Sequence, residues 1–422
     1  MKTIFRFLSM AALLAGIAVT GAFAQEPCSD VDTPTAQYEK FLGLYNKKPQ
    51  VKAEVQEAVN TGKAFLEKFG ACEAWKDQSA FVKQHVTRLE TKVIPGIDLN
   101  EWFLKFDNAI KSDNADELYA AGKEILAKQP DNLNIMFVMA VVGPREVGKK
   151  NMKYNADSLR YAKAVYDKLK AGTELPKTGN DGKKYIGALK YEMGKDDAMS
   201  ELAFVQGYMN FYGLNNKKAA MPFYYELSQS PGGRKTFAPA FATIGEFYLA
   251  ERAPIGDQIA KKIAEIKAAP TDEEKVKLDG ELKPLIALFN GYTERALDAF
   301  SRAWKLAKDD TPAGKTYKDG LYKEMQAIYE DRFEKKEGLD QWISAAIAKP
   351  LPDPTSTVQP VADPEVTTTT NTTTGGGGAN GSGIGTANGT GVGTANGTGL
   401  GTPSGKTVGT PAAPKAAVAK KP

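Results

Sequence analysis

Residues 291–310 of the chain read GYTERALDAFSRAWKLAKDD, and this stretch decides the fold class. Its apolar residues recur every three to four positions, the period of a helix with one buried face. They are Ala296, Phe300, Ala303 and Ala307, with Leu297 and Trp304 beside them. The opposite face carries charges that we expect to stay in water: Glu294, Arg295, Asp298, Arg302, Lys305 and Lys308. The stretch predicts a helix that packs against other helices. It contains no residue that suggests catalysis.

Most of the chain between residues 33 and 348 shows the same helical period, and no run alternates apolar and polar residues as a half-buried strand would. We therefore expect an all-α fold with almost no sheet. Turn residues and lysines interrupt the rhythm at residues 172–197, where we expect an inserted loop and a short helix near residues 185–193. The other expected helices cover residues 33–48, 51–69, 74–93, 99–112, 115–128, 133–142, 156–169, 198–213, 216–228, 236–252, 257–268, 273–289, 291–310, 316–335 and 339–348.

The spacing of the decisive stretch recurs in two other segments. The three sets are Ala162, Tyr166 and Leu169; Ala220, Tyr224 and Leu227; and Ala296, Phe300 and Ala303. A small residue, an aromatic four positions on and a small residue three further resembles the second helix of tetratricopeptide (TPR) repeats. The third position is bulkier in the first two sets, and the family's first-helix pattern is mostly missing.

The TPR-like resemblance covers residues 99–350. It implies antiparallel helix pairs stacked as an α-solenoid, with a concave groove that binds peptides or protein partners. It does not imply an enzyme. A generic α-solenoid is the alternative.

The first 24 residues have the features of a secretory signal peptide. Lys2 and Arg6 precede an apolar run, and Ala22-Phe23-Ala24 matches the A-x-A cleavage pattern. We expect a mature chain that starts at Gln25 and is exported to a bacterial periplasm or cell envelope, or secreted. An uncleaved membrane anchor is the alternative.

Residues 25–98 are expected to form an N-terminal helical hairpin region that contains both cysteines, Cys28 and Cys72. Export to an oxidising compartment permits a disulfide between them. Two free thiols, or a Cys72 that is merely buried, are the alternatives.

The composition changes abruptly after Pro350. Residues 351–366 form a proline-punctuated stretch, and the remainder is rich in Thr, Gly, Asn and Ala. Such a segment cannot bury enough apolar surface to offset the entropy of ordering, so we expect a disordered low-complexity tail over residues 351–422.

The formal net charge of +4 comes from the two ends of the chain. Without the leader and tail cations, 49 basic residues face 51 acidic ones; those cations are Lys2, Arg6, Lys406, Lys415, Lys420 and Lys421. A near-neutral folded part gives no argument for nucleic-acid binding.

Catalytic and metal chemistry find little support in the residue types. His85 is the single histidine, so with two cysteines the usual zinc ligand sets cannot be assembled. Residues 143–150 read GPREVGKK, but Lys150 stands where a phosphate-binding loop needs Ser or Thr. A carboxylate pair for glycoside hydrolysis stays an open alternative, because no pair is marked. We expect no enzyme, no cofactor and no metal.

Aromatic residues near the ends of two helices are the candidate partner-binding residues. They are Tyr208, Phe211, Tyr212, Phe247 and Tyr248. If these residues lie on a concave face, their rings and hydroxyls could bind a peptide. The alternative is that they pack in the core between repeats. The expected function is an exported, non-enzymatic scaffold for a protein or peptide partner. The alternative is a structural envelope protein tethered to the cell wall or an anionic surface by its Lys/Ala/Pro tail.

Overall fold

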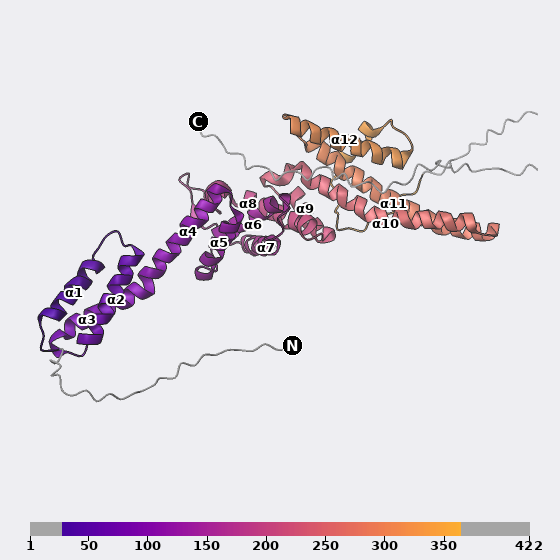
Figure 1. Ribbon diagram of the computed structural model, residues 1–422. Coiled ribbons are helices and arrows are strands. Elements are labelled where there is room, and N and C mark those ends of the chain that lie inside the picture. Colours follow the sequence, from indigo (N-terminus) through magenta and orange to yellow (C-terminus); the bar gives the residue numbers. More distant parts are fainter. Residues whose placement is uncertain (1–27, 364–422) are drawn as a thin grey trace, which may run out of the picture. The chain divides into compact units, whose positions relative to one another are not determined.

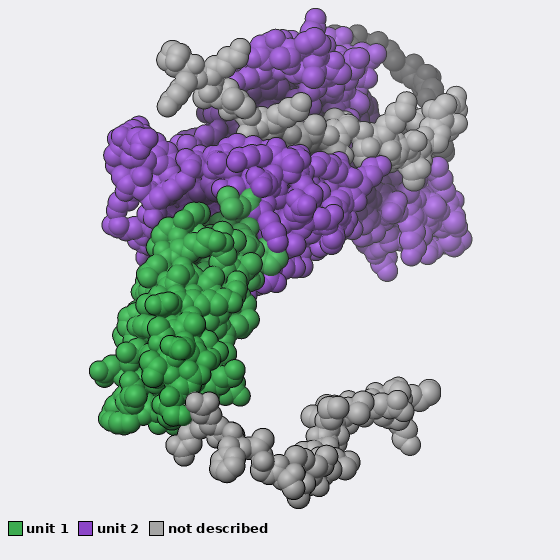
Figure 2. All heavy atoms as spheres, turned by 60° about the vertical axis from the view of Figure 1, so that its left-hand side comes forward, with its two compact units in different colours: residues 1–104 green, residues 105–422 purple. Residues whose placement is uncertain are grey.

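The structure is a computed structural model that describes residues 28–363 (Figure 1). Over these residues the chain is all-α apart from one two-stranded sheet. It divides into two compact units, residues 1–104 and 105–422, which Figure 2 colours green and purple. The expected signal peptide lies outside the described residues.

The first unit is built on three helices: α1 (Asp32–Tyr45), α2 (Lys52–Phe69) and α3 (Lys76–Arg88). They enclose a core whose side chains are nearly inaccessible to solvent: Phe41, Val59, Phe65, Val82 and Leu89. α2 comes so close to its neighbours that a Cβ on Gly62 would lie 2.4 Å from Cγ2 of Val86.

Cys28 and Cys72 form a disulfide in this unit, 44 residues apart in sequence. The pairing closes the segment that contains α1 and α2. The sequence left free thiols open as an alternative.

Removing this bridge by the double change Cys28→Ser and Cys72→Ser is expected to destabilise the first unit by about 2–4 kcal/mol, because the loop regains its entropy in the unfolded chain. Denaturation of the full chain under oxidising and reducing conditions measures the effect. Identical unfolding curves for the reduced and oxidised chain would contradict the expectation.

The third expected helix does not end before Pro95. A π turn (Leu89–Val93) leads from α3 directly into α4 (Ile94–Ser112), and the amide of Ile94 bonds to the carbonyl of Leu89. This wider turn leaves room for Pro95, which has no N–H to continue the normal ladder.

Beyond the unit boundary inside α4, the second unit consists mainly of helices that pack against their neighbours in sequence. Asparagine and threonine N-caps explain several of the starts, such as Asn132, whose Oδ1 accepts from the amide of Ile135 at 3.2 Å. The helices are α5 (Ala115–Lys128), α6 (Leu133–Gly148), α7 (Asn155–Lys170), α8 (Lys195–Tyr208), α9 (Lys217–Gln229), α10 (Ala238–Ala268), α11 (Asp272–Leu306), α12 (Pro312–Phe333) and α13 (Leu339–Ile347).

The expected insertion at residues 172–197 is largely a loop, but it differs from the expectation at residues 185–193. A hairpin of β1 (Lys177–Thr178) and β2 (Lys184–Tyr185) and a 3₁₀ turn (Leu189–Tyr191) replace the short helix. Residues 143–150 fall mostly inside α6, so the strand-loop-helix context of a phosphate-binding loop is absent there.

Two pairs of expected helices are single long helices. α10 has 31 residues and runs through Pro254, and α11 has 35 residues and runs through Pro284. The two helices lie side by side over much of their length (Figure 1). This packing outweighs the hydrogen bond lost at each proline. The sequence instead predicts helix breaks at residues 253–256 and at residue 290.

Residues 351–363, expected as part of the disordered tail, form an extended segment packed on α11, which we call the strap. The amide of Val361 donates to the carbonyl of Ala287 at 2.8 Å, and Nδ2 of Asn290 donates to the carbonyl of Val361 at 3.2 Å. Val358 is 5% exposed. The first 13 residues of the expected tail are therefore ordered, and its remainder, residues 364–422, lies outside the described residues.

Candidate functional site

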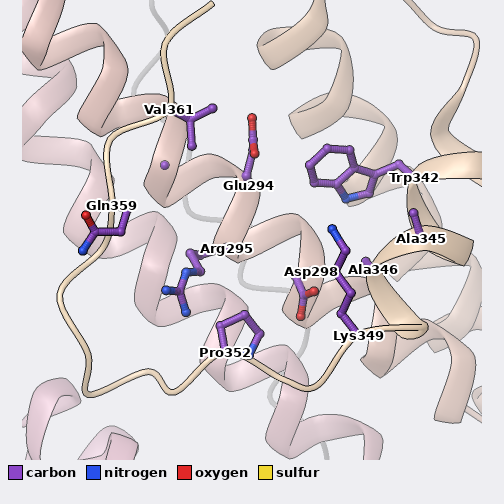
Figure 3. A pocket seen from close by; sticks show the side chains of 11 residues that line it. Glu294, Arg295, Asp298, Trp342, Ala345, Ala346, Lys349, Pro352, Gln359 and Val361 are labelled. Carbon is purple, nitrogen blue, oxygen red and sulfur yellow. The ribbon is translucent and has the colours of Figure 1, made fainter.

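A cavity of about 270 Å³ lies between α11, α13 and the strap (Figure 3). We call it the strap pocket. Trp342, Ala345 and Val361 give it apolar walls, and four charged side chains complete it: Glu294, Arg295, Asp298 and Lys349. Three of these four belong to the polar face of the decisive stretch.

The two carboxylates of the strap pocket, Asp298 and Glu294, pair with arginines that do not line the pocket. Nε and Nη2 of Arg302 donate to the carboxylate oxygens of Asp298 at 2.8 and 3.2 Å. The Nη2 atom also donates to the carbonyls of Ala346 and Lys349 at the end of α13, both at 2.8 Å. Glu294 accepts from Nε of Arg332 at 3.1 Å.

Burial raises the pKa of the Asp298 carboxyl above its ordinary value, although Arg302, Arg295 and Lys349 oppose the shift. Desolvation therefore outweighs the ion pair at this position. The ion pair with the guanidinium of Arg302 offsets part of the cost of burying this carboxylate.

In the described part of the chain, the two cations of the strap pocket form no ion pair of their own, although both act on the Asp298 carboxyl from a longer distance. Within residues 28–363, neither Arg295 nor Lys349 lies within ion-pair distance of a carboxylate. The Nη1 atom of Arg295 and the Nε1 atom of Trp342 are buried and form no hydrogen bond with any described residue. The guanidinium of Arg295 does lie near the buried hydroxyl of Tyr248, where it opposes the rise of that group's pKa. An unmade bond from a buried donor is costly, so these donors favour an acceptor supplied from outside.

None of the five candidate aromatic residues lines the strap pocket, and four of them are buried. Tyr208, Phe211, Phe247 and Tyr248 are between 2% and 5% exposed, because the neighbouring helices close over them. Their burial favours the alternative, core packing between helices. The repeat-signature residues are also buried: Ala162, Tyr166, Leu169, Ala220, Tyr224, Leu227, Ala296, Phe300 and Ala303.

Tyr212 is the exception, because it lines a second, smaller cavity of about 70 Å³ together with Glu246, Tyr317 and Glu324. We call it the acidic cavity. Phe300 of the decisive stretch forms part of its apolar wall. Two of its lining residues were singled out from the sequence, Tyr212 as a candidate partner-binding residue and Phe300 as part of the repeat signature.

Sequence reasoning missed the strap pocket because its charged residues looked like a solvated helix face. The signal that could have found them is the mixture of signs at helical spacing, with Asp298 and Arg302 one turn apart, followed downstream by Trp342 and a proline-containing segment. That signal is common on exposed helices, so it would not have been specific.

His85 packs between two aromatic rings. Its ring centroid lies 4.1 Å from that of Phe81 and 4.6 Å from that of Tyr45. Across residues 28–363 there is no group of three or more His, Cys, Asp or Glu residues that could hold a metal ion. Among the helices described, none combines the length and the apolar character needed to cross a membrane.

Comparisons of the chain with protein-family models, with curated proteins and with solved structures give no match. The case for function therefore depends on the geometry of the two cavities and on the sequence.

Proposed function

We propose that the chain is an exported, non-enzymatic helical-repeat scaffold that binds a protein or peptide partner in the periplasm or cell envelope. The buried signature residues and the sequential packing of the helices support a TPR-like α-solenoid as its architecture. The features of the first 24 residues support export.

The observation that carries the proposal is the pair of cations without carboxylate partners in the strap pocket. Arg295 and Lys349 line a cavity that also offers the indole N–H of Trp342 and apolar walls. A carboxylate with a short apolar stem satisfies both features, because the donors bind its oxygens and the stem covers the walls. The pocket therefore receives an acidic side chain of the partner.

The size of the pocket fits this role. Sites for drug-sized ligands and cofactors usually have about 300–1,000 Å³. A volume of about 270 Å³ lies just below that range and accommodates one or two side chains of a peptide.

Panning a random peptide library against the full chain tests the proposal. We expect the selected peptides to be enriched in Asp and Glu, and we expect Arg295→Met to weaken their binding about tenfold or more, as the loss of a hydrogen bond between charged groups does. Fluorescence anisotropy with labelled peptides measures the affinities. Lys305→Met is the matched control, because Lys305 is an exposed cation on the same helix.

Selected peptides without acidic residues would overturn the proposal, and so would equal binding to the Arg295→Met and Lys305→Met variants. Thermal unfolding of both variants shows whether each is folded under the binding conditions.

A further inference from the structure

The acidic cavity shares no lining residue with the strap pocket, and its two charged lining residues, Glu246 and Glu324, are both acidic. Four elements meet around it. The π turn Met209–Gly213 brings Tyr212, α10 brings Glu246, α11 brings Phe300, and α12 brings Tyr317 and Glu324.

Glu246 is held in a fixed position at the wall of this cavity. The hydroxyl of Tyr212 donates to Oε2 of Glu246 at 3.0 Å, and it lies 3.1 Å from Oγ1 of Thr243. No Lys or Arg among residues 28–363 forms an ion pair with Glu246 or with Glu324. Glu246 is thus a largely buried carboxylate without a cation of its own.

The surroundings of Glu246 penalise its charge. Burial raises the pKa of its carboxyl, and the negative charge of Glu324 raises it further. The bond from Tyr212 and the more distant Lys217 lower the same pKa without cancelling the burial. A buried carboxylate that lacks a counter-ion is costly, and a cation placed in the cavity would remove that cost.

Tyr317 supplies a second polar atom without a partner. Its hydroxyl oxygen is buried and has no hydrogen bond within the described part of the chain. Burial raises the pKa of Tyr317, and the charge of Glu246 adds to that shift. The hydroxyl therefore stays protonated at neutral pH and can accept from, or donate to, a group in the cavity.

We propose that the acidic cavity binds the primary ammonium group of an aliphatic amine, either a lysine side chain of a partner or a free diamine. An ammonium group has three N–H donors, and Glu246, Glu324 and Tyr317 offer oxygen acceptors in the same small space. Phe300 and Leu321 cover the methylene stem. A volume of about 70 Å³ holds the ammonium group and part of that stem.

The proposal predicts how binding responds to pH. The ammonium group pairs with ionised Glu246, so affinity rises as pH increases through the raised pKa of that carboxyl. The other polar and titratable groups that face Glu246 are Thr243 on its own helix, Tyr212, Tyr224, Lys217, Tyr317 and Glu324. Burial raises the pKa values of Tyr212, Tyr224 and Tyr317, so their hydroxyls stay protonated over this range.

Isothermal titration calorimetry of the full chain with cadaverine and with Nα-acetyl-lysine methylamide tests the proposal. We expect saturable binding of at least one amine, with an affinity that Glu246→Gln lowers about tenfold or more. The amide oxygen of glutamine still accepts from Tyr212, so the wall of the cavity stays in place. Glu324→Gln is the second variant and is expected to weaken binding in the same direction.

Glu251→Gln is the matched control, because Glu251 is an exposed acid on the same helix as Glu246. Binding of the lysine derivative alone supports a partner's side chain as the source of the ammonium group, and binding of cadaverine alone supports a free diamine. Absence of amine binding at millimolar concentration overturns the proposal, as does an affinity that is the same in the Glu246→Gln and Glu251→Gln variants.

Discussion

Replacing Arg302 by methionine is expected to lower the free energy of unfolding by about 3–5 kcal/mol at neutral pH. The side chains of Arg302 and Asp298 are each 13% exposed, so little water screens their interaction. The methionine would leave the Asp298 carboxylate without its ion-pair partner and would remove the bonds that Arg302 donates to the carbonyls of Ala346 and Lys349. The buried carboxylate of Asp298 then carries its own desolvation cost.

The destabilisation should grow with pH. The pKa of Asp298 already lies above the ordinary value of 3.8 because of burial, and removal of Arg302 raises it further. A carboxyl with a raised folded-state pKa binds protons in the folded state, so its variant loses stability as pH rises from about 4 towards neutral. Chemical denaturation at about pH 4.5 and about pH 7.5 measures the difference.

Lys163→Met provides the control for this prediction. Lys163 and Asp167 form an ion pair at the same four-residue spacing, with side chains 68% and 55% exposed. An exposed pair contributes about 0.5 kcal/mol or less. Equal losses in the Arg302→Met and Lys163→Met variants would show that the buried network does not stabilise the fold.

Replacing Phe300 by alanine is expected to cost about 3–5 kcal/mol, because a ring that is 4% exposed leaves a cavity behind. The ring lies directly against α10 at Gly245, where a Cβ would come within 2.7 Å of its Cε2 atom. The close approach of α10 and α11 therefore depends on one large and one minimal side chain.

This contact makes a double-mutant cycle informative. Gly245→Ala alone should cost about 1–3 kcal/mol through overpacking, but much less when Phe300 is already alanine, because the new methyl enters vacant space. Gly280→Ala is the control, since a Cβ at that position of α11 meets nothing within 4 Å. It should leave stability unchanged or raise it slightly. Additive costs of Gly245→Ala and Phe300→Ala would contradict the contact.

The positions of the helices were the part of the fold that the sequence predicted best. The period of apolar residues located the decisive helix, and Ala296, Phe300 and Ala303 are buried as that period requires. Helix ends at prolines were less predictable. Whether Pro95 or Pro254 stops a helix depends on a π turn or on a neighbouring helix, and neither is visible in the local sequence.

The candidate sites were less predictable than the helices, for a related physical reason. Periodicity shows that Glu294, Arg295 and Asp298 oppose the apolar face, but not that α13 and the strap cover that second face. The composition of the strap predicts that it belongs to the low-complexity tail. The hydrogen bonds that order Val361 come from residues about 70 positions earlier in the chain, so the local sequence does not show them. Whether a polar helix face is buried depends on segments that are distant in the sequence.

The strap also determines how the protein responds to tension. A pull applied to the chain beyond residue 363 is transmitted first to the ion pair between Asp363 and Arg332, and then to the hydrogen bonds of Val361 with α11. These contacts carry the force before it reaches α13. Once they break, Val361 leaves and the strap pocket loses a wall. Mechanical strain at the carboxyl-terminal side and the shape of the cavity are therefore coupled through one short segment.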